Sequence, residues 1–354
     1  MFKETYNIIG VMSGTSLDGI DLAHIYFTIH DGKWQFKIHE SETIPYPITW
    51  LNKLKVAVDF SEEELTQLNK NYTTYLATVI RSFIDRHAIS ELDAVCSHGH
   101  TILHQPQNSF TLQIGNLPLL GELLCEKIVC DFRVQDVQLG GQGAPLVPIG
   151  DRILFSDYTF CLNLGGFSNV SFEDNNQRIA FDISAVNTVL NFYANQLGLE
   201  YDDKGKISKS GKINLDLLSE LNELDYYKKP FPKSLGFEFV KEIVLPLIDN
   251  YNIAIENKMH TFIEHIALQT AWALPQKQGQ LLITGGGAYN DFLIERIQYH
   301  LSQLQVIIPE RKILEYKEAL IFALLGVLKL RSEINVLSSV TGAKMDHSSG
   351  TILN

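Results

Sequence analysis

The most informative segment of the chain reads Gly10-Val11-Met12-Ser13-Gly14-Thr15-Ser16-Leu17-Asp18-Gly19-Ile20-Asp21. It joins two apolar runs, residues 6–12 and 20–29, whose composition is typical of β-strands, so the sequence predicts a strand–turn–strand hairpin. Glycines allow backbone N–H groups to approach an anion closely, and the hydroxyls of Thr15 and Ser16 add further donors. We therefore expect a phosphate-binding turn between the two strands.

The same order of elements recurs in the second half of the chain. Strand-like residues 158–164 lead into Gly165-Gly166, and residues 167–172 and 177–182 have the composition of two further strands. The first half has its matching third strand at 33–38. This repeat predicts a duplicated fold of two domains whose hairpins face one another across a cleft, an N-terminal domain at 1–150 and a C-terminal domain at 151–354.

A third glycine cluster, Gly285-Gly286-Gly287, follows the apolar run 281–284 and precedes a predicted helix at 290–304. Nucleotides bind where a strand passes through glycines into a helix in α/β proteins. A plain tight turn is the alternative for each of the glycine groups.

The charge and composition exclude several functional classes. The 354 residues include 29 Lys+Arg and 41 Asp+Glu, and the net charge of −12 argues against nucleic acid as a general partner. The four cysteines form no CxxC pair, which favours buried thiols in a reducing compartment. No apolar run approaches the ~20 residues that a membrane span needs, and no signal peptide is evident. We expect a cytoplasmic protein without a membrane partner.

Several helices carry clear signals. Ser61 and Glu64 form a predicted capping box at the start of a helix whose apolar face extends to residue 83. Ser184 is a candidate cap for a helix that follows it. Further helices are predicted at about 258–274 and 315–331, and the last of them leads into an irregular tail, 332–354.

Taken together, the motifs of the chain closely resemble those of the anhydro-N-acetylmuramic acid kinases over essentially its whole length. Besides the glycine turns, the matching segments are Ser97-His98-Gly99-His100-Thr101, Asp131-Phe132-Arg133, Gly140-Gly141-Gln142-Gly143-Ala144-Pro145-Leu146-Val147-Pro148, Leu162-Asn163-Leu164, Ala288-Tyr289-Asn290, Glu318-Ala319-Leu320-Ile321-Phe322-Ala323 and Ser339-Val340-Thr341-Gly342-Ala343.

The resemblance implies an α/β fold of the sugar-kinase, actin and heat-shock ATPase superfamily, with two ribonuclease-H-like domains around an ATP cleft. It implies a homodimeric enzyme that uses ATP, Mg²⁺ and water. Such an enzyme opens 1,6-anhydro-N-acetylmuramic acid and phosphorylates it to N-acetylmuramic acid 6-phosphate in peptidoglycan recycling and amino-sugar degradation.

The resemblance also implies a general base, Asp182, which would take a proton from the water that attacks the anomeric carbon. An aspartate is ionised at pH 7, so it can act without unusual tuning. A capping or turn carboxylate beside Ser184 is the alternative. The family commonly has Asp-Thr-Gly-Pro-Gly-Asn here, whereas this chain has Asp182-Ile183-Ser184-Ala185-Val186-Asn187 and so lacks the glycines.

For ATP, the resemblance implies phosphate and nucleoside contacts by the three glycine groups. Asp18 is the candidate to hold Mg²⁺, through water because that ion gives up its hydration shell reluctantly; a structural cap is its alternative. The implied ATP-binding residues are Gly14, Thr15, Ser16, Leu17, Asp18, Gly19, Ile20, Asp21, Gly165, Gly166, Gly285, Gly286 and Gly287.

For the sugar, the implied contacts are Arg133, Glu318, His98 and Asn187. The planar fork of Arg133 suits the lactyl carboxylate of muramic acid, and a salt bridge to Asp131 or Asp136 is the alternative. Glu318 has the alternative of a solvated carboxylate in the first turn of a helix. His98 lies in a cluster with His100 and His104, and hydrogen bonding by His98 near the sugar is favoured over a metal site in this cluster.

Two other functions stay open on the sequence. An ordinary sugar kinase would use Asp182 to deprotonate a sugar hydroxyl rather than water. A non-enzymatic ATPase module, like actin or a chaperone, would show no dependence on a sugar.

Overall fold

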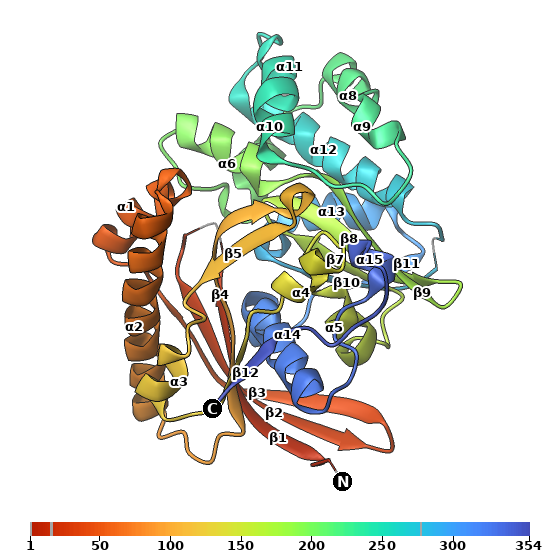
Figure 1. Cartoon of the computed structure of the whole chain (residues 1–354). Helices are drawn as coiled ribbons and strands as arrows, with labels where there is room; N and C mark the ends of the chain where they lie inside the picture. Colours follow the sequence, from red (N-terminus) through yellow and green to blue (C-terminus); the bar gives the residue numbers. More distant parts are fainter. Residues whose placement is uncertain (1, 15–16, 277) are drawn as a thin grey trace. The chain divides into compact units, whose positions relative to one another are not determined.

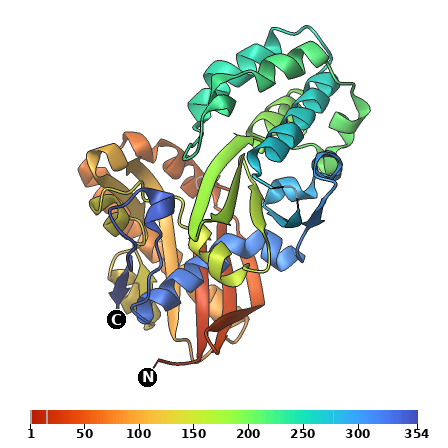
Figure 2. The same cartoon turned by 90° about the vertical axis from the view of Figure 1, so that its right-hand side faces the viewer.

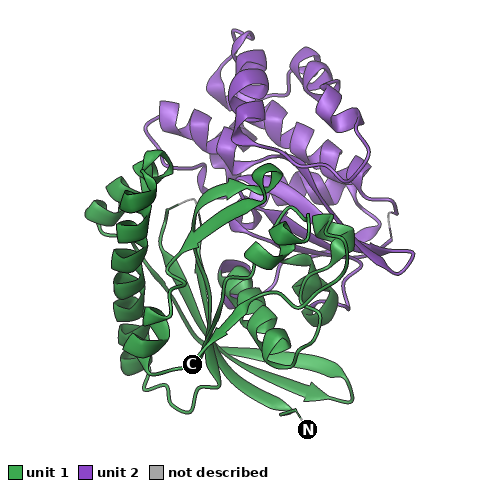
Figure 3. Ribbon diagram, viewed as in Figure 1, with its two compact units in different colours: residues 1–154, 316–354 green, residues 155–315 purple. Residues whose placement is uncertain are grey.

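The computed structural model describes residues 2–14, 17–276 and 278–354, and its chain divides into two compact units (Figure 1, Figure 3). Unit 1 contains residues 1–154 and 316–354, and unit 2 contains residues 155–315. The boundary near residue 154 lies close to the predicted one. The predicted C-terminal domain, 151–354, differs from unit 2, because residues 316–354 return to unit 1.

Unit 1 is built on a mixed sheet. Strands β1, β2 and β3 form an antiparallel meander, and β4 and β6 continue the sheet parallel to β1. The order is β12-β6-β4-β1-β2-β3, with β5 paired to β4 off this path. The strands are β1 (Thr5–Ser13), β2 (Ile20–His30), β3 (Lys33–Ile44), β4 (Ala94–Gln105), β5 (Phe110–Ile114), β6 (Ile128–Cys130) and β12 (Thr351–Leu353).

Unit 2 repeats this arrangement. Its sheet has the order β11-β10-β7-β8-β9, in which β7, β8 and β9 form an antiparallel meander and β10 and β11 continue the sheet parallel to β7. The strands are β7 (Phe160–Leu164), β8 (Phe167–Asp174), β9 (Gln177–Ala185), β10 (Gly279–Thr284) and β11 (Leu304–Ile307). Five strands in matching order in each unit confirm the predicted duplicated α/β fold.

Both faces of β1 are covered. Ile9 and Val11 belong to a buried apolar cluster with α2, whereas Gly10 meets the backbone of α14 at Ala319, because successive residues of a strand point to opposite faces. The predicted capping box at Ser61 and Glu64 is present at the start of α2. The helices with residues in unit 1 are α1 (Ile48–Val56), α2 (Glu62–Arg86), α3 (Leu119–Leu124), α4 (Val134–Gln138), α5 (Pro148–Leu154), α14 (Arg311–Leu330) and α15 (Ser338–Thr341).

The core of unit 2 joins its sheet to α6, α12 and α13, and Figure 2 shows α12 beside the strands. The helices are α6 (Asn187–Gln196), α7 (Lys206–Ser210), α8 (Leu215–Asn222), α9 (Asp225–Lys228), α10 (Phe237–Phe239), α11 (Leu245–Asp249), α12 (Ile255–Ala273) and α13 (Asp291–His300). Ser184 does not cap α6, because its hydroxyl donates to the carbonyl of Ala185 and the cap residue is Val186.

The tail predicted as irregular contains ordered elements. Strand β12 pairs with β6, and α15 precedes it. Three cysteines are buried as expected, but Cys125 is exposed. In the part of the chain that the structure describes, no helix is both long and apolar enough to span a membrane.

Candidate active site

One backbone hydrogen bond links the described residues Gly14 and Leu17 between β1 and β2. The N–H of Leu17 donates to the carbonyl of Gly14 at 3.3 Å, and Leu17 has a φ of +62°. A Cβ at Gly19 would lie 2.7 Å from the carbonyl oxygen of Ile44, so only glycine fits there. Asp18 is exposed on this turn. The predicted donors Thr15 and Ser16 lie outside the described residues.

The two carboxylates of this segment differ in their surroundings. Asp21 accepts a hydrogen bond from the hydroxyl of Thr43 at 2.6 Å, which ties β2 to β3, and Ile20 beside it is buried. Among the described residues, no group of three or more His, Cys, Asp or Glu side chains could hold a metal ion. A divalent cation at Asp18 would therefore take most of its ligands from water and phosphate.

The turn Gly165-Gly166 is bonded to the start of α6. The carbonyl of Gly165 accepts from the N–H of Asn187, and that of Gly166 accepts from the N–H groups of Val186 and Thr188. The missing family glycines are not needed for this backbone, since no residue from 183 to 186 has a positive φ. The turn and the segment that follows Asp182 thus form one connected piece of structure.

The Gly285-Gly286-Gly287 cluster packs closely on β7. Gly285 has a φ of +85°, and a Cβ there would lie 2.6 Å from Oδ1 of Asn163. A Cβ at Gly287 would lie 2.7 Å from the Cβ of Leu164. Glycine is therefore required for the close approach of this turn to β7.

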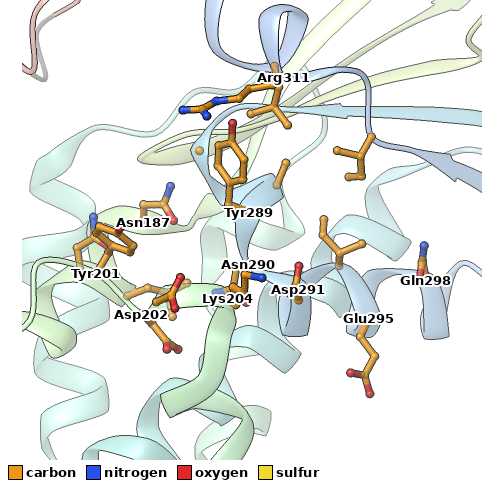
Figure 4. A pocket seen from close by; sticks show the side chains of 18 of the residues that line it. Asn187, Tyr201, Asp202, Lys204, Tyr289, Asn290, Asp291, Glu295, Gln298 and Arg311 are labelled. Atoms are coloured by element: carbon orange, nitrogen blue, oxygen red, sulfur yellow. The ribbon is translucent and has the colours of Figure 1, made fainter.

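A cavity of about 860 Å³ opens beside this cluster within unit 2, a size common for small-molecule sites. Gly286 and Asn187 line it, together with the aromatic ring of Tyr289 (Figure 4). Arg311 lies above Tyr289 in that view, and Glu315 accepts from both, at 2.9 Å and 2.8 Å. The structure thus places Asn187 beside the glycine cluster 285–287, in the unit that does not contain Arg133.

Asp182 lies on β9, three residues before the strand ends, and Ile183 beside it is the extra residue of a β-bulge. The N–H of Leu235 donates to Oδ2 of Asp182 at 2.9 Å, and the carbonyl of Lys233 accepts from the N–H of Asp182. Among the described residues, Oδ1 has no hydrogen-bond partner. Burial raises the pKa of Asp182, and the bond from Leu235 opposes the rise. One carboxylate oxygen is thus held while the other stays available.

A tyrosine fixes the backbone at the same position. The hydroxyl of Tyr226 donates to the carbonyl oxygen of Asp182 at 2.6 Å. We expect Tyr226→Phe to lower kcat roughly fivefold, the effect of about 1 kcal/mol for one hydrogen bond, because β9 loses an anchor. Steady-state kinetics beside Tyr299→Phe, a change at an exposed ring, test this. Equal kcat in both variants would contradict it.

In unit 1, Arg133 and His98 form a hydrogen-bonded pair. Nε of Arg133 donates to Nε2 of His98 at 2.8 Å, and Nη1 donates to the carbonyl of Gly143 at 2.6 Å. His98 in turn donates from Nδ1 to the carbonyl of Gly99, so both of its nitrogens are engaged and neither binds a metal. Phe322 packs on the imidazole and the guanidinium. Within the described residues, Nη2 of Arg133 has no protein partner.

Burial and nearby charges shift the pKa values of Arg133 and Glu318. Burial lowers the pKa of Arg133 to about 10, and Glu318 and Asp136 oppose that change. Loss of surrounding water raises the pKa of Glu318, although its side chain keeps an exposed surface, and Arg133 is the chief group opposing the rise. Glu318 follows the non-helical Tyr316 within α14, and Lys317 beside it is paired with the buried Asp151 at 2.7 Å. The predicted residues Arg133, His98 and Glu318 therefore gather in one unit.

Asp136 explains why the distant motifs 140–148 and 339–343 occur together. Its fully buried carboxylate accepts from the N–H of Gly143 at 2.6 Å and from the hydroxyl of Thr341 at 2.7 Å. Within the described residues, Arg133 forms no ion pair with Asp131 or Asp136, the two alternatives considered for it; its side-chain hydrogen bonds go to His98 and Gly143. Sequence reasoning missed the role of Asp136, and also Tyr226, Leu235 and Phe322, because no motif spacing links them to their partners.

Two units with one strand order, each with a glycine turn between its first two strands, define the sugar-kinase and actin class of ATPases. Unit 2 adds a glycine cluster at a cavity.

The chain belongs to the anhydro-N-acetylmuramic acid kinase family, whose profile matches residues 6–354. It is 34% identical to the anhydro-N-acetylmuramic acid kinase of Mannheimia succiniciproducens, with 99% of each chain covered. The enzyme of the same name from Pseudomonas fluorescens is also 34% identical, over 95% of this chain and 96% of that one. The one from Hydrogenovibrio crunogenus is 31% identical over 97% of both.

Proposed function

We propose that this protein uses ATP to convert 1,6-anhydro-N-acetylmuramic acid into N-acetylmuramic acid 6-phosphate during peptidoglycan recycling. The family membership supports this reaction. The observation that carries the mechanism is Asp182, whose Oδ2 is held by Leu235 while Oδ1 is available to a water molecule.

In the proposed reaction, water attacks the anomeric carbon and Asp182 accepts its proton at Oδ1. The bond between the anomeric carbon and O6 breaks, and O6 forms a bond to the γ-phosphorus of ATP. The bond from that phosphorus to the bridging oxygen of ADP breaks in turn. One water, one sugar and one ATP thus give the sugar phosphate and ADP.

The proposed ATP site is assigned to the three glycine groups. The turn at Gly14–Gly19 and the turn Gly165-Gly166 would take the phosphates, and the cavity beside Gly286 would take the nucleoside. Asp18 would hold Mg²⁺ through water, and the ion would neutralise phosphate charge. The exposed position of Asp18 supports this assignment.

Arg133 is assigned to the lactyl carboxylate of the sugar. Its Nε and Nη1 donate to His98 and Gly143, which fixes the plane of the guanidinium, and Nη2 has no protein partner among the described residues. A planar guanidinium recognises a carboxylate better than an ammonium does, because it offers donors in a fixed geometry.

We expect Arg133→Lys to raise the KM for the anhydro sugar roughly 10- to 100-fold, since a hydrogen bond to a charged group contributes about 1.5–3 kcal/mol. The KM for ATP should not change. The measurement pairs this sugar with 1,6-anhydro-N-acetylglucosamine, which lacks the lactyl group and should show no penalty. Arg86→Lys, at an exposed pair with Glu42, is the control. An equal penalty on both sugars would contradict the assignment.

The first test of the function is ADP release by the purified protein with Mg-ATP and either the anhydro sugar or N-acetylmuramic acid, with the product mass recorded. A gain of one phosphoryl group and one water on the anhydro sugar is expected. Activity on the open sugar alone would indicate an ordinary sugar kinase. ADP release without either sugar would indicate an ATPase module.

The homodimer and the cytoplasmic location are proposed on the family resemblance. The buried thiols Cys96 and Cys130 fit a reducing compartment.

A further inference from the structure

Four buried side chains form a hydrogen-bonded cluster at the foot of the Gly14–Gly19 turn. Ser13, the last residue of β1, has its hydroxyl oxygen 2.5 Å from that of Tyr46, 2.7 Å from Nδ1 of His100 and 3.2 Å from that of Tyr72. The hydroxyls of Tyr46 and Tyr72 are 2.5 Å apart. No member is more than 5% exposed. The residue that precedes the turn is therefore held by three side chains.

A local irregularity of the sheet brings His100 to this position. Val11 pairs with Ser97, but Ser13 pairs with His100, so β4 has one more residue than β1 between the two pairs. Gly99 absorbs the extra residue with a φ of +73°, as glycine does in a β-bulge. Bulges re-aim a side chain at a chosen point of a sheet, and here the side chain is the imidazole that reaches Ser13.

The number of protons fixes the tautomer of His100. Four contacts join the cluster, and each needs one proton, but the three hydroxyl groups supply only three. Burial lowers the pKa of His100 to about 4, so at neutral pH the ring carries a single N–H. All four contacts are satisfied when Ser13 donates to Tyr46, Tyr46 to Tyr72, Tyr72 to Ser13, and His100 donates from Nδ1 to Ser13.

We propose that His100 in its Nδ1–H form, with Tyr46 and Tyr72, is a positioning residue that holds Ser13 and so limits the conformations of the adjoining Gly14, where the segment proposed to bind ATP phosphates begins. This inference rests on the proposed function for its effect on ATP. No member of the cluster is among the residues assigned to ATP, Mg²⁺ or the sugar. The cluster acts through the backbone, because fixing Ser13 limits the freedom of the next residue, Gly14, which otherwise has the widest conformational range.

The first measurement is the tautomer of His100 by nitrogen NMR of the ¹⁵N-histidine-labelled protein, with His100→Asn used to assign the signal. The Nδ1–H form is expected. The Nε2–H form would contradict the proposed hydrogen-bonding scheme. The NMR measurement does not depend on any enzyme activity.

The second measurement separates positioning from a general effect on folding. Tyr46→Phe and Tyr72→Phe should each raise the KM for ATP roughly 5- to 10-fold, the effect of one lost hydrogen bond, with the KM for the sugar unchanged. His100→Asn, which keeps an N–H near the position of Nδ1, should retain a lower KM for ATP than His100→Leu. Tyr75→Phe is the matched control, because its ring packs against Tyr46 and Tyr72 but its hydroxyl is not in the cluster.

A fall in kcat without a change in the KM for ATP would overturn the positioning role, as would equal behaviour of Tyr46→Phe and Tyr75→Phe. A wild-type protein without ATP-dependent turnover would instead overturn the proposed function, and the tautomer would still decide the hydrogen-bonding scheme.

Discussion

Asp182→Asn is expected to lower kcat roughly 10²- to 10⁴-fold, the usual contribution of a positioned general base, while binding of ATP stays intact. The amide has nearly the shape of the carboxylate but cannot accept a proton from water. Single-turnover product formation and ATP titration on the same protein separate the two effects. Asp225→Asn, at an exposed position on α9, is the control. Near-normal turnover would remove Asp182 from the role of base.

The pH dependence of the wild type follows from the same residue. Burial raises the pKa of Asp182 above its ordinary value of 3.8, and the base acts only when it is ionised. The acid limb of kcat should therefore lie above pH 3.8, with activity lost as the pH falls through it. It should be absent from the residual activity of Asp182→Asn.

The contribution of Asp182 to the stability of the fold should change with pH in the direction opposite to the activity. A raised pKa means that the folded state binds this proton more tightly than the unfolded chain, so Asp182 favours folding below pH 3.8 and loses that contribution as the pH rises through the folded pKa. At neutral pH, Asp182→Asn should unfold at a temperature equal to or above that of the wild type. Functional sites commonly show this conflict between stability and activity.

Gly10→Ala is expected to destabilise unit 1 by about 1–3 kcal/mol or more, as overpacking does. The added Cβ would lie 2.0 Å from the carbonyl oxygen of Ala319, a backbone atom that no side-chain rotation can move away. Helix α14 must then shift, and Glu318 shifts with it. Denaturant unfolding and the KM for the anhydro sugar measure the two consequences.

The control for this prediction is Gly121→Ala in α3. A Cβ there meets its nearest atoms at 3.5 Å, an ordinary contact, and alanine favours helix over glycine. It should leave stability unchanged or increase it. Equal stability of the two variants would show that α14 yields to the added methyl group at no cost.

The sequence was most informative where a local pattern determines a local structure. The capping box at Ser61 and the repeated strand–glycine–strand order required no knowledge of distant partners, and both are present. Asp182, Arg133 and Glu318 were predicted through the family motifs, and their roles stay predictions.

The remaining features depend on contacts between distant segments. Strand β12 has three residues, too few to show an alternating pattern, and it forms because it pairs with β6 at the edge of the sheet. The carbonyl of Lys233 and the N–H of Leu235 hold Asp182, and any residue could supply the first and any residue except proline the second. The role of Asp136 required knowledge that residue 341 returns to the loop at 143.

The return of the chain to unit 1 has a consequence for biosynthesis. Unit 2 is one continuous stretch, 155–315. Unit 1 is completed only when residues 341–353 have left the ribosome, because they supply the edge strand β12 of its sheet and Thr341, the partner of the loop at 143. Domains generally fold as units during synthesis, the N-terminal one first. In this chain the order in which the units complete their folds is reversed. Unit 2 can fold completely while the nascent unit 1 still exposes the open edge of β6.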